Sequence, residues 1–210
     1  MQKRQQHRFA EGLINPSLLP ELNYSEIHHL DHWGYWQASL EKPLLILGQD
    51  WGTVEYYRNY LQDPDSNRTN QNLRSLLTQV GWDPGTVSAP EHSTIPLFFT
   101  NVILAPFLQK PRSMPTSWLR EGVEVFIDPL LEILQPRAIV TLGRWPYEAL
   151  RKYGQQGSAL PVAPLKTLIQ HVPFHYGSVP LFSFYHCGGL GLVQRALSEQ
   201  QADWQRLKKT

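Results

Sequence analysis

The run Leu44-Leu-Ile-Leu-Gly48 constrains the fold more than any other stretch of the chain. Four consecutive large aliphatic residues suit a β-strand that is buried on both faces, and the glycine ends the run. Gln49, Asp50 and Trp51 follow directly. In open α/β sheets, ligands bind outside the carboxyl ends of such strands, so this amide, carboxylate and indole stand where a site is expected.

Alternating apolar and helical patterns predict the rest of the architecture. Strands are expected at 43–47, 97–104, 138–142 and 180–185, and helices at 70–80, 119–134, 145–153 and 192–207, the second of these kinked or divided at Pro129. Parallel strands need long crossover connections of this kind. We therefore predict an α/β fold: a three-layer α/β/α sandwich with a central, mostly parallel four-stranded sheet.

Length and composition favour a single globular domain. The 210 residues, 41% hydrophobic and 18% charged, fit one α/β core over 41–210, with residues 1–40 as an N-terminal helical or irregular cap and a helix start near 23–27. A net charge of +1 gives no general basic field, so any nucleic-acid contact must come from a local patch.

Cysteine content and hydropathy limit the cellular environments that we expect for the chain. A single cysteine, Cys187, excludes an intramolecular disulfide and an all-cysteine metal site. No apolar stretch reaches the roughly 20 residues that a membrane-spanning helix needs. We expect a monomeric cytoplasmic protein that contacts no membrane.

In a parallel sheet the four strand ends share one edge. That edge would bring together residues from all four strand ends: Gln49 and Asp50 from the first, Asn101 from the second, Gly143 and Arg144 from the third, and His186 from the fourth. Each has an ordinary alternative: the aspartate as a turn or helix cap, the asparagine as a turn residue, the histidine as a core residue. Together, carboxylate, amide and imidazole can position water, read a planar polar ligand and stabilise departing negative charge.

The order of these motifs resembles the uracil-DNA glycosylase superfamily. Gly48-Gln-Asp-Trp-Gly52 is similar to its first motif, Phe98-Phe-Thr-Asn-Val102 to its strand-two motif, and Tyr185-His-Cys-Gly-Gly-Leu190 stands at the place of its last motif. The segment 139–143 with the helix after it is also typical. The resemblance covers about residues 43–195.

The resemblance implies hydrolysis of the N-glycosidic bond of uracil or a related deaminated base in DNA, with no cofactor and no metal. Asp50 would orient water and His186 would hydrogen-bond the departing base as the two catalytic residues. Asn101 would pair with the base edge, and Gly48, Gln49 and Trp51 would complete the substrate-binding residues.

DNA, single-stranded or as a duplex with a damaged base, would be the partner. The target must flip out of the stack, and Leu190, which follows Gly188 and Gly189 and precedes Gly191, suits a wedge near the vacated position. Alternatively, Leu190 packs beneath the last helix. Lys110, Arg112 and Ser113 would grip phosphates, or else form an ordinary solvated loop.

The chain also departs from the family pattern. Trp51 and Gly52 replace Pro-Tyr, whose tyrosine excludes the thymine methyl group, and residues 63–72 lack the usual stacking aromatic; Tyr56, Tyr57 and Phe99 are candidates to replace it. Cys187 and Gly188 replace the Pro-Ser of the family's last motif. Whether this loop contacts phosphate as it does in the family is therefore an open question.

Other groupings suggest different chemistry. His28, His29, Asp31 and His32 form either a metal site or, in the favoured interpretation, a polar helix face. Cys187 beside His186 invites a thiol nucleophile, but neighbours on a strand point apart. Three hypotheses remain: a base-excising glycosylase, a family member that binds nucleic acid or a free base without cleavage, and an unrelated α/β hydrolase acting on a small polar substrate.

Overall fold

A computed structural model describes residues 6–19 and 36–209. One sheet organises this part of the chain, with strand order β1-β3-β2-β4-β6-β5. The strands are β1 (Trp36–Gln37), β2 (Leu44–Gly48), β3 (Leu97–Asn101), β4 (Ala138–Leu142), β5 (Phe174–Tyr176) and β6 (Val179–Phe184).

The sheet is mixed. Its inner strands β3, β2, β4 and β6 pair in parallel, whereas β1 pairs antiparallel with β3, and β5 antiparallel with β6. The α/β class is confirmed, but the predicted four-stranded sheet is wrong, because the sheet has six strands. Edge strands of two and three residues are too short to produce an apolar run or an alternating pattern.

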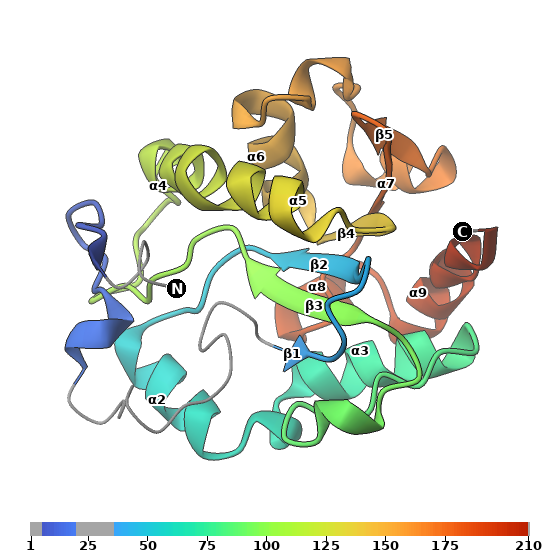
Figure 1. The fold of residues 1–210 in the computed structure, drawn as a ribbon, viewed down its shortest axis with the longest axis horizontal. Coiled ribbons are helices and arrows are strands. Elements are labelled where there is room, and N and C mark those ends of the chain that lie inside the picture. Colours follow the sequence, from blue (N-terminus) through green and yellow to red (C-terminus); the bar gives the residue numbers. More distant parts are fainter. Residues whose placement is uncertain (1–5, 20–35, 210) are drawn as a thin grey trace.

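Helices cover both faces of the sheet. In Figure 1, α4, α5 and α6 lie on one side, and α2, α3 and α9 on the other. The helices are α2 (Val54–Gln62), α3 (Arg68–Gln79), α4 (Thr116–Glu121), the π-helix η4 (Gly122–Ile127), α5 (Asp128–Leu134), α6 (Arg144–Tyr153), α7 (Leu165–Gln170), α8 (Gly189–Gln194) and α9 (Leu197–Trp204). Short 3₁₀ turns are η1 (Pro16–Leu18), η2 (Pro64–Ser66), η3 (Pro90–His92), η5 (Gly157–Ala159) and η6 (Gln205–Lys209).

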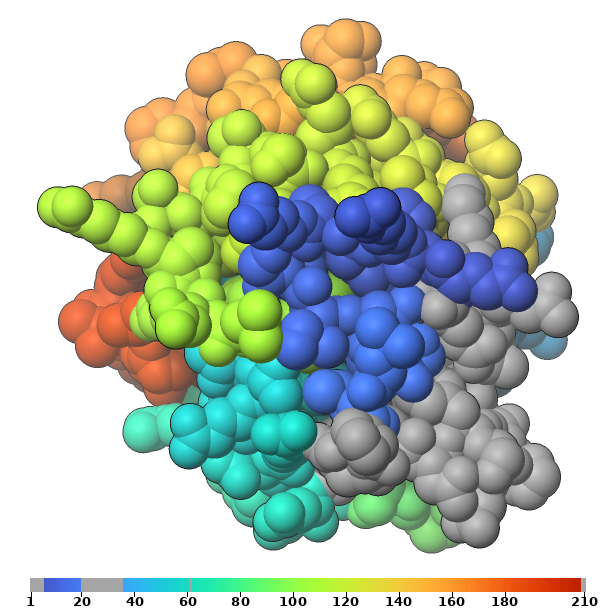
Figure 2. Space-filling model, turned by 90° about the vertical axis from the view of Figure 1, so that its left-hand side faces the viewer, coloured from blue at the N-terminus to red at the C-terminus, as the bar shows by residue number. Residues whose placement is uncertain are grey.

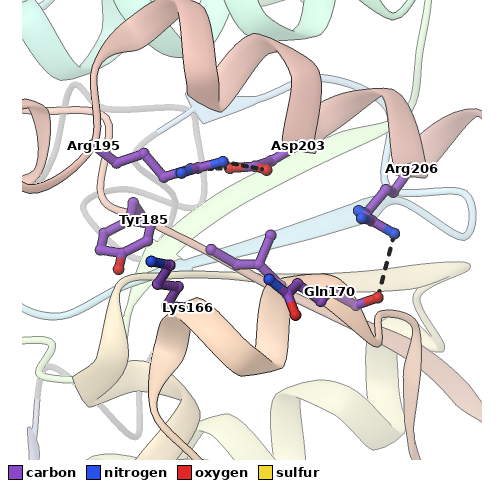
Figure 3. A pocket seen from close by; sticks show the side chains of 7 residues that line it. Lys166, Gln170, Tyr185, Arg195, Asp203 and Arg206 are labelled. Atoms are coloured by element: carbon purple, nitrogen blue, oxygen red, sulfur yellow. Dashed lines mark hydrogen bonds and ion pairs between the residues drawn. The ribbon is translucent and has the colours of Figure 1, made fainter.

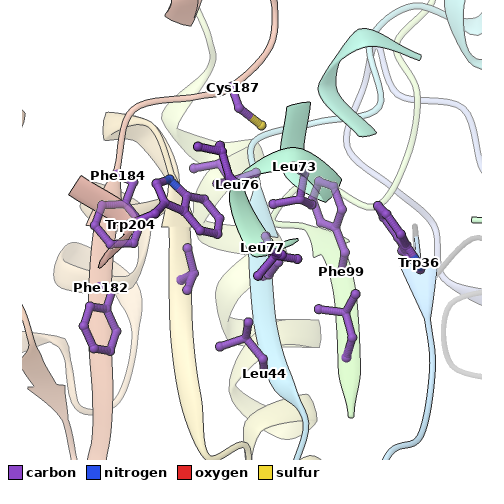
Figure 4. Close-up of a cluster of buried hydrophobic side chains, with 14 of the residues drawn as sticks. Trp36, Leu44, Leu73, Leu76, Leu77, Phe99, Phe182, Phe184, Cys187 and Trp204 are labelled. Atoms are coloured by element: carbon purple, nitrogen blue, oxygen red, sulfur yellow. The ribbon is translucent and has the colours of Figure 1, made fainter. Parts of the chain in front are cut away.

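Two apolar cores explain why the strand sequences are continuously hydrophobic. Leu44 and Ile46 enter the core beneath α3 and α9, which Figure 4 shows with Trp204 and Phe184. Leu45 and Leu47 point to the opposite core, against α4 and α6. Because side chains alternate along a strand and both faces are covered, every position of β2 must be apolar or glycine.

The predicted strand 97–104 is too long. β3 ends at Asn101, and its continuation follows β2 through backbone bonds from the Val102 N–H to the Gly48 carbonyl (2.9 Å) and from the Ile103 N–H to the Gln49 carbonyl (3.0 Å). The apolar residues after Asn101 are buried. They resemble a strand in sequence because they line the core, although the chain is already leaving the sheet.

Two helix predictions also need correction. The single helix predicted at 192–207 is divided between α8 and α9, where Arg195 has extended backbone and its side chain pairs with Asp203. The pattern at 119–134 is helical throughout, but a π-helix precedes Pro129 instead of a break at that proline. Proline is tolerated there because it occupies the first turn of α5.

The described part of the N-terminal cap joins the loops at the strand ends. Gly12 and Ile14 bond to Leu108 and Pro106, and Phe107 bonds in turn to Gly52 and Val54. Figure 2 shows this segment, in blue, against the yellow-green segment that follows β3. The predicted helix start at 23–27 lies outside the described residues.

None of the helices in residues 6–19 and 36–209 combines the length and the apolar character needed to cross a membrane.

Candidate functional site

The topology reverses direction between β2 and β4, which is where open α/β sheets have their ligand crevice. The chain leaving β2 goes to β3 on one side, and the chain leaving β4 goes to β6 on the other. Such a reversal between neighbouring parallel strands is the usual ligand position in open α/β sheets. The strand ends are level, since Gly48 pairs with Asn101 and Leu142 pairs with Phe184. Gln49, Asp50, Asn101 and His186 therefore lie at one edge of the sheet.

Asn101 ends β3 with its side chain lying over Gly48. A Cβ added at Gly48 would lie 2.2 Å from Asn101 Oδ1, so glycine is required for the amide to occupy this position. The side chain is 3% exposed, and its Nδ2 has no hydrogen-bond partner among the described residues. A buried amide donor left unpaired costs about 1–3 kcal/mol, so a ligand that accepts its hydrogen bond would be stabilised there.

Asp50 stands at the turn after β2. Its Oδ1 accepts the Gly52 N–H at 2.8 Å, and Gly52 has a positive φ of 77° that favours glycine. Burial raises the pKa of the Asp50 carboxyl, while the bonds from Gly52 and the Gln49 side chain, and the charge of Lys110, act to lower it. The carboxyl is thus enclosed but held by donors and a nearby cation.

His186 follows β6 and is held in one tautomer. The Gly188 N–H donates to His186 Nδ1 at 2.9 Å, so Nδ1 is an acceptor and the ring proton belongs on Nε2. Burial lowers the pKa of the imidazole. The histidine is therefore neutral near pH 7 and presents an Nε2–H donor.

Asn101 and His186 belong to the same side of the sheet. Asn101 shares its strand face with Phe99, and His186 follows Phe184; both phenylalanines are in the core beneath α3. Three strand spacings separate the ends of β3 and β6, a span of about 14 Å between backbones.

A chain of contacts links the Asp50 turn to the His186 loop. Tyr56 packs on Gly52, where an added Cβ would lie 2.9 Å from Tyr56 Cδ1, and its hydroxyl accepts from Asn67 Nδ2 at 2.7 Å. Asn67 caps α3 by accepting the Thr69 N–H, and Thr69 Oγ1 would lie 2.5 Å from a Cβ at Gly188. These residues form a wall between the two loops.

Sequence reasoning missed Asn67 and Thr69 as parts of this wall. The helix-capping pattern at Asn67 was the available signal, but capping alone does not indicate a site. Of the three candidate aromatics, Tyr57 and Phe99 are buried and Tyr56 is 48% exposed. Tyr56 is therefore the aromatic side chain that a ligand can reach.

Trp51 lies in the core and not in the crevice. Its indole is 2% exposed and meets the Tyr57 ring edge-to-face at 5.2 Å between centroids. The prediction that Trp51 contacts substrate does not fit this burial. Trp51 instead supports the turn that carries Asp50 from inside the core.

The loop after His186 is partly buried and partly exposed. Gly188 is buried against the His186 ring, whereas Gly189 is exposed and Leu190 is 79% exposed. The alternative in which Leu190 packs beneath the last helix is therefore wrong. Val193, one turn along α8, extends this apolar surface.

Cations surround the same edge. Lys110, Arg112 and Ser113 are exposed in the loop between β3 and α4, and Lys110 is near enough to lower the pKa of Asp50. Arg144 is exposed at the start of α6, beside a partly exposed Trp145. The segment 102–115 contains no acidic residue. Lys110, in a segment without acidic residues, is thus a cation close to Asp50 despite the near-neutral net charge.

Of the other predicted groupings, only Cys187 with His186 falls among the described residues. Residues 28–32, with the possible metal ligands His28, His29, Asp31 and His32, lie outside the described residues. Within the described ranges, no three or more His, Cys, Asp and Glu side chains gather as metal ligands. Cys187 is buried, and its Sγ contacts the Thr69 carbonyl rather than the His186 ring.

No protein-family model matches the chain, and no curated protein matches its sequence.

Cys187 should behave as an inert core thiol. Burial raises its pKa to about 12, so almost no thiolate exists at about pH 8. We expect no alkylation of the native protein by iodoacetamide and complete alkylation in concentrated guanidinium chloride, measured by mass spectrometry. Rapid reaction of the folded protein would contradict the burial and reopen thiol chemistry.

Proposed function

We propose that this protein is a DNA glycosylase-like hydrolase that excises uracil or a related deaminated base by base flipping and water attack. The observation that carries the proposal is the unpaired Asn101 amide on Gly48, at the same edge as the enclosed Asp50 and the neutral His186. The similarity of the three motifs to the uracil-DNA glycosylase superfamily points in the same direction.

The reaction needs opposite charges stabilised at two ends of one bond. A water oxygen bonds to the sugar C1′ while the C1′–N bond breaks, and the electron pair of the broken bond leaves with the base. The proton that the water loses ends on the departing base, so that the products are the sugar hydroxyl and the neutral free base. The sugar gains positive charge and the base negative charge. Asp50, in its ionised form, would orient the water and stabilise the sugar cation.

His186 suits the leaving-group end. Because Nδ1 accepts the Gly188 N–H, Nε2–H remains to donate to the O2 oxygen of the departing base. A neutral imidazole can stabilise an oxyanion by hydrogen bonding without transferring its proton. The Asn101 amide would pair donor and acceptor with the imide edge of uracil, giving Nδ2 the partner that it lacks in the free protein.

Base flipping costs a few kcal/mol, and two exposed apolar groups are placed to offset it. Leu190 would fill the vacated position in the stack, and Tyr56 would stack on or border the flipped base. Tyr56 rather than residue 52 would then form the wall that faces the C5 position of a pyrimidine, because Gly52 has no side chain. Lys110 and Arg112 would contact phosphates.

The first test is excision from single-stranded and mismatched duplex oligonucleotides carrying uracil, hypoxanthine or xanthine, read as abasic product. We expect cleavage of at least one base by the wild type. Asp50→Asn should lower the single-turnover rate about 10²- to 10⁴-fold, and His186→Ala about 10²- to 10³-fold. Asn101→Leu, which keeps the shape of the side chain, should lower it at least about 10²-fold with no loss of thermal stability.

Exposed residues away from the edge provide the controls. Glu132→Gln and His171→Ala remove the same functional groups elsewhere and should keep the wild-type rate. Tight oligonucleotide binding without abasic product would favour a binding protein that does not cleave. Neither binding nor cleavage would leave an unrelated α/β hydrolase acting on a small polar substrate.

The pH dependence should contain one acidic limb and a plateau. Asp50 must be ionised, and its pKa is raised above 3.8, so the rate should rise with pH through that raised value. His186 is active when neutral, and burial lowers its pKa below 6.5, so the limb that belongs to His186 should be centred below that pH. Single-turnover rates across pH test this. A limb centred above 6.5 that disappears in His186→Gln would contradict the neutral-donor role.

Leu190→Ala should separate flipping from chemistry. Removing the wedge should lower the rate on duplex substrate about tenfold or more, because unstacking is no longer compensated. The rate on single-stranded substrate should change less than about twofold, since no partner strand has to be replaced. Val162→Ala, an equally exposed truncation elsewhere, is the control. Equal losses on both substrates would mean that Leu190 acts otherwise.

A further inference from the structure

A second pocket lies beside the end of β6, outside the crevice between β2 and β4. Figure 3 shows it between α7 and α9, lined by Lys166 and Gln170 from α7, Tyr185 after β6, Arg195 between α8 and α9, and Asp203 and Arg206. Ile169 adds an apolar contribution to the lining. The pocket is thus almost entirely polar and built from four separate segments.

The pocket carries more positive than negative charge. Arg195 pairs with Asp203, with Nη2 at 2.9 Å from Asp203 Oδ1, and also contacts Glu199. Lys166 has no acidic partner within the described ranges, and Arg206 donates to the Gln170 carbonyl at 3.4 Å instead of to a carboxylate. One cation is therefore neutralised and two are not.

The Arg195–Asp203 pair also shapes the pocket. Its two parallel hydrogen bonds hold the guanidinium in a defined plane. Tyr185 lies close enough for its hydroxyl to influence the pKa of Arg195. A phosphate group in this pocket would meet two uncompensated cations and a phenolic donor.

We propose that this pocket binds a phosphate group. Its connection to the candidate site suggests the source: Tyr185 directly precedes His186, and the segment from Tyr185 to Arg195 also carries Leu190. A phosphate of the strand whose base enters the crevice could be held at the other end of this segment. That choice of source rests on the proposed function, whereas phosphate binding itself does not.

Titration of ¹⁵N-labelled full-length protein with inorganic phosphate, at constant ionic strength, tests the pocket directly. We expect saturable shifts of the Tyr185 amide and of the Arg195 and Arg206 side-chain signals. Lys166→Ala/Arg206→Ala should weaken binding at least fivefold. Arg74→Ala/Lys208→Ala removes equal charge from exposed positions outside the pocket and should not.

An unmodified thymidine octanucleotide distinguishes the two sources of phosphate. If the DNA strand supplies the phosphate, the pocket variant should bind the octamer at least fivefold more weakly. The slope of log K against log[salt] should also become shallower by about 0.7, the value for one phosphate contact on a single strand. If only inorganic phosphate binding is lost, the pocket takes a free phosphate or phosphorylated small molecule.

The absence of saturable shifts in the wild type, or equal effects of pocket and control variants, would overturn the proposal. The wild-type titration needs no variant, and Lys166→Gln/Arg206→Gln provides a second pair if the alanine pair is unstable. If the wild type excises a base but shows no saturable phosphate binding, only the pocket proposal fails. Phosphate binding without any excision would count against the proposed glycosylase activity alone.

Discussion

The level ending of four parallel strands is the constraint on which the candidate site depends. Backbone pairing places Gly48 beside Asn101 and Leu142 beside Phe184, so the loops that follow must all leave at one edge. Both faces of these strands are covered by helices, so polar side chains can reach a ligand only at or beyond the strand ends. The close contact of the Asn101 amide with Gly48 exists because β2 ends in a residue without a side chain.

Burial acts on the two titratable groups of this edge in opposite directions. It raises the pKa of Asp50 and lowers that of His186, favouring the neutral form of each. Donors from Gly52 and Gln49 and the charge of Lys110 oppose the effect at Asp50, while His186 receives only a hydrogen bond that leaves it neutral. In the proposed function, the ionised form of Asp50 and the neutral form of His186 would serve the two ends of a bond in which charge separates.

Much of the fold could be predicted from periodicity, and the failures have physical causes. The inner strands are continuous apolar runs because two cores demand them. The edge strands β1 and β5 are too short to create a pattern, and α2 was not predicted. The division between α8 and α9 coincides with the long-range pair of Arg195 and Asp203, which no local propensity encodes. The residues after Asn101 are apolar for the core and not for the sheet.

The sequence by itself determined which side chains follow each strand end, because chain order and strand parity are local properties. It could not determine which of them reach a ligand. Trp51 and Tyr56 are both aromatic and close in sequence, yet packing buries the first and exposes the second. The tautomer of His186, the unpaired amide of Asn101 and the pocket lined by Tyr185 were likewise decided by tertiary structure. Each depends on the positions of groups from distant segments, which only the assembled sheet and its covering helices bring together.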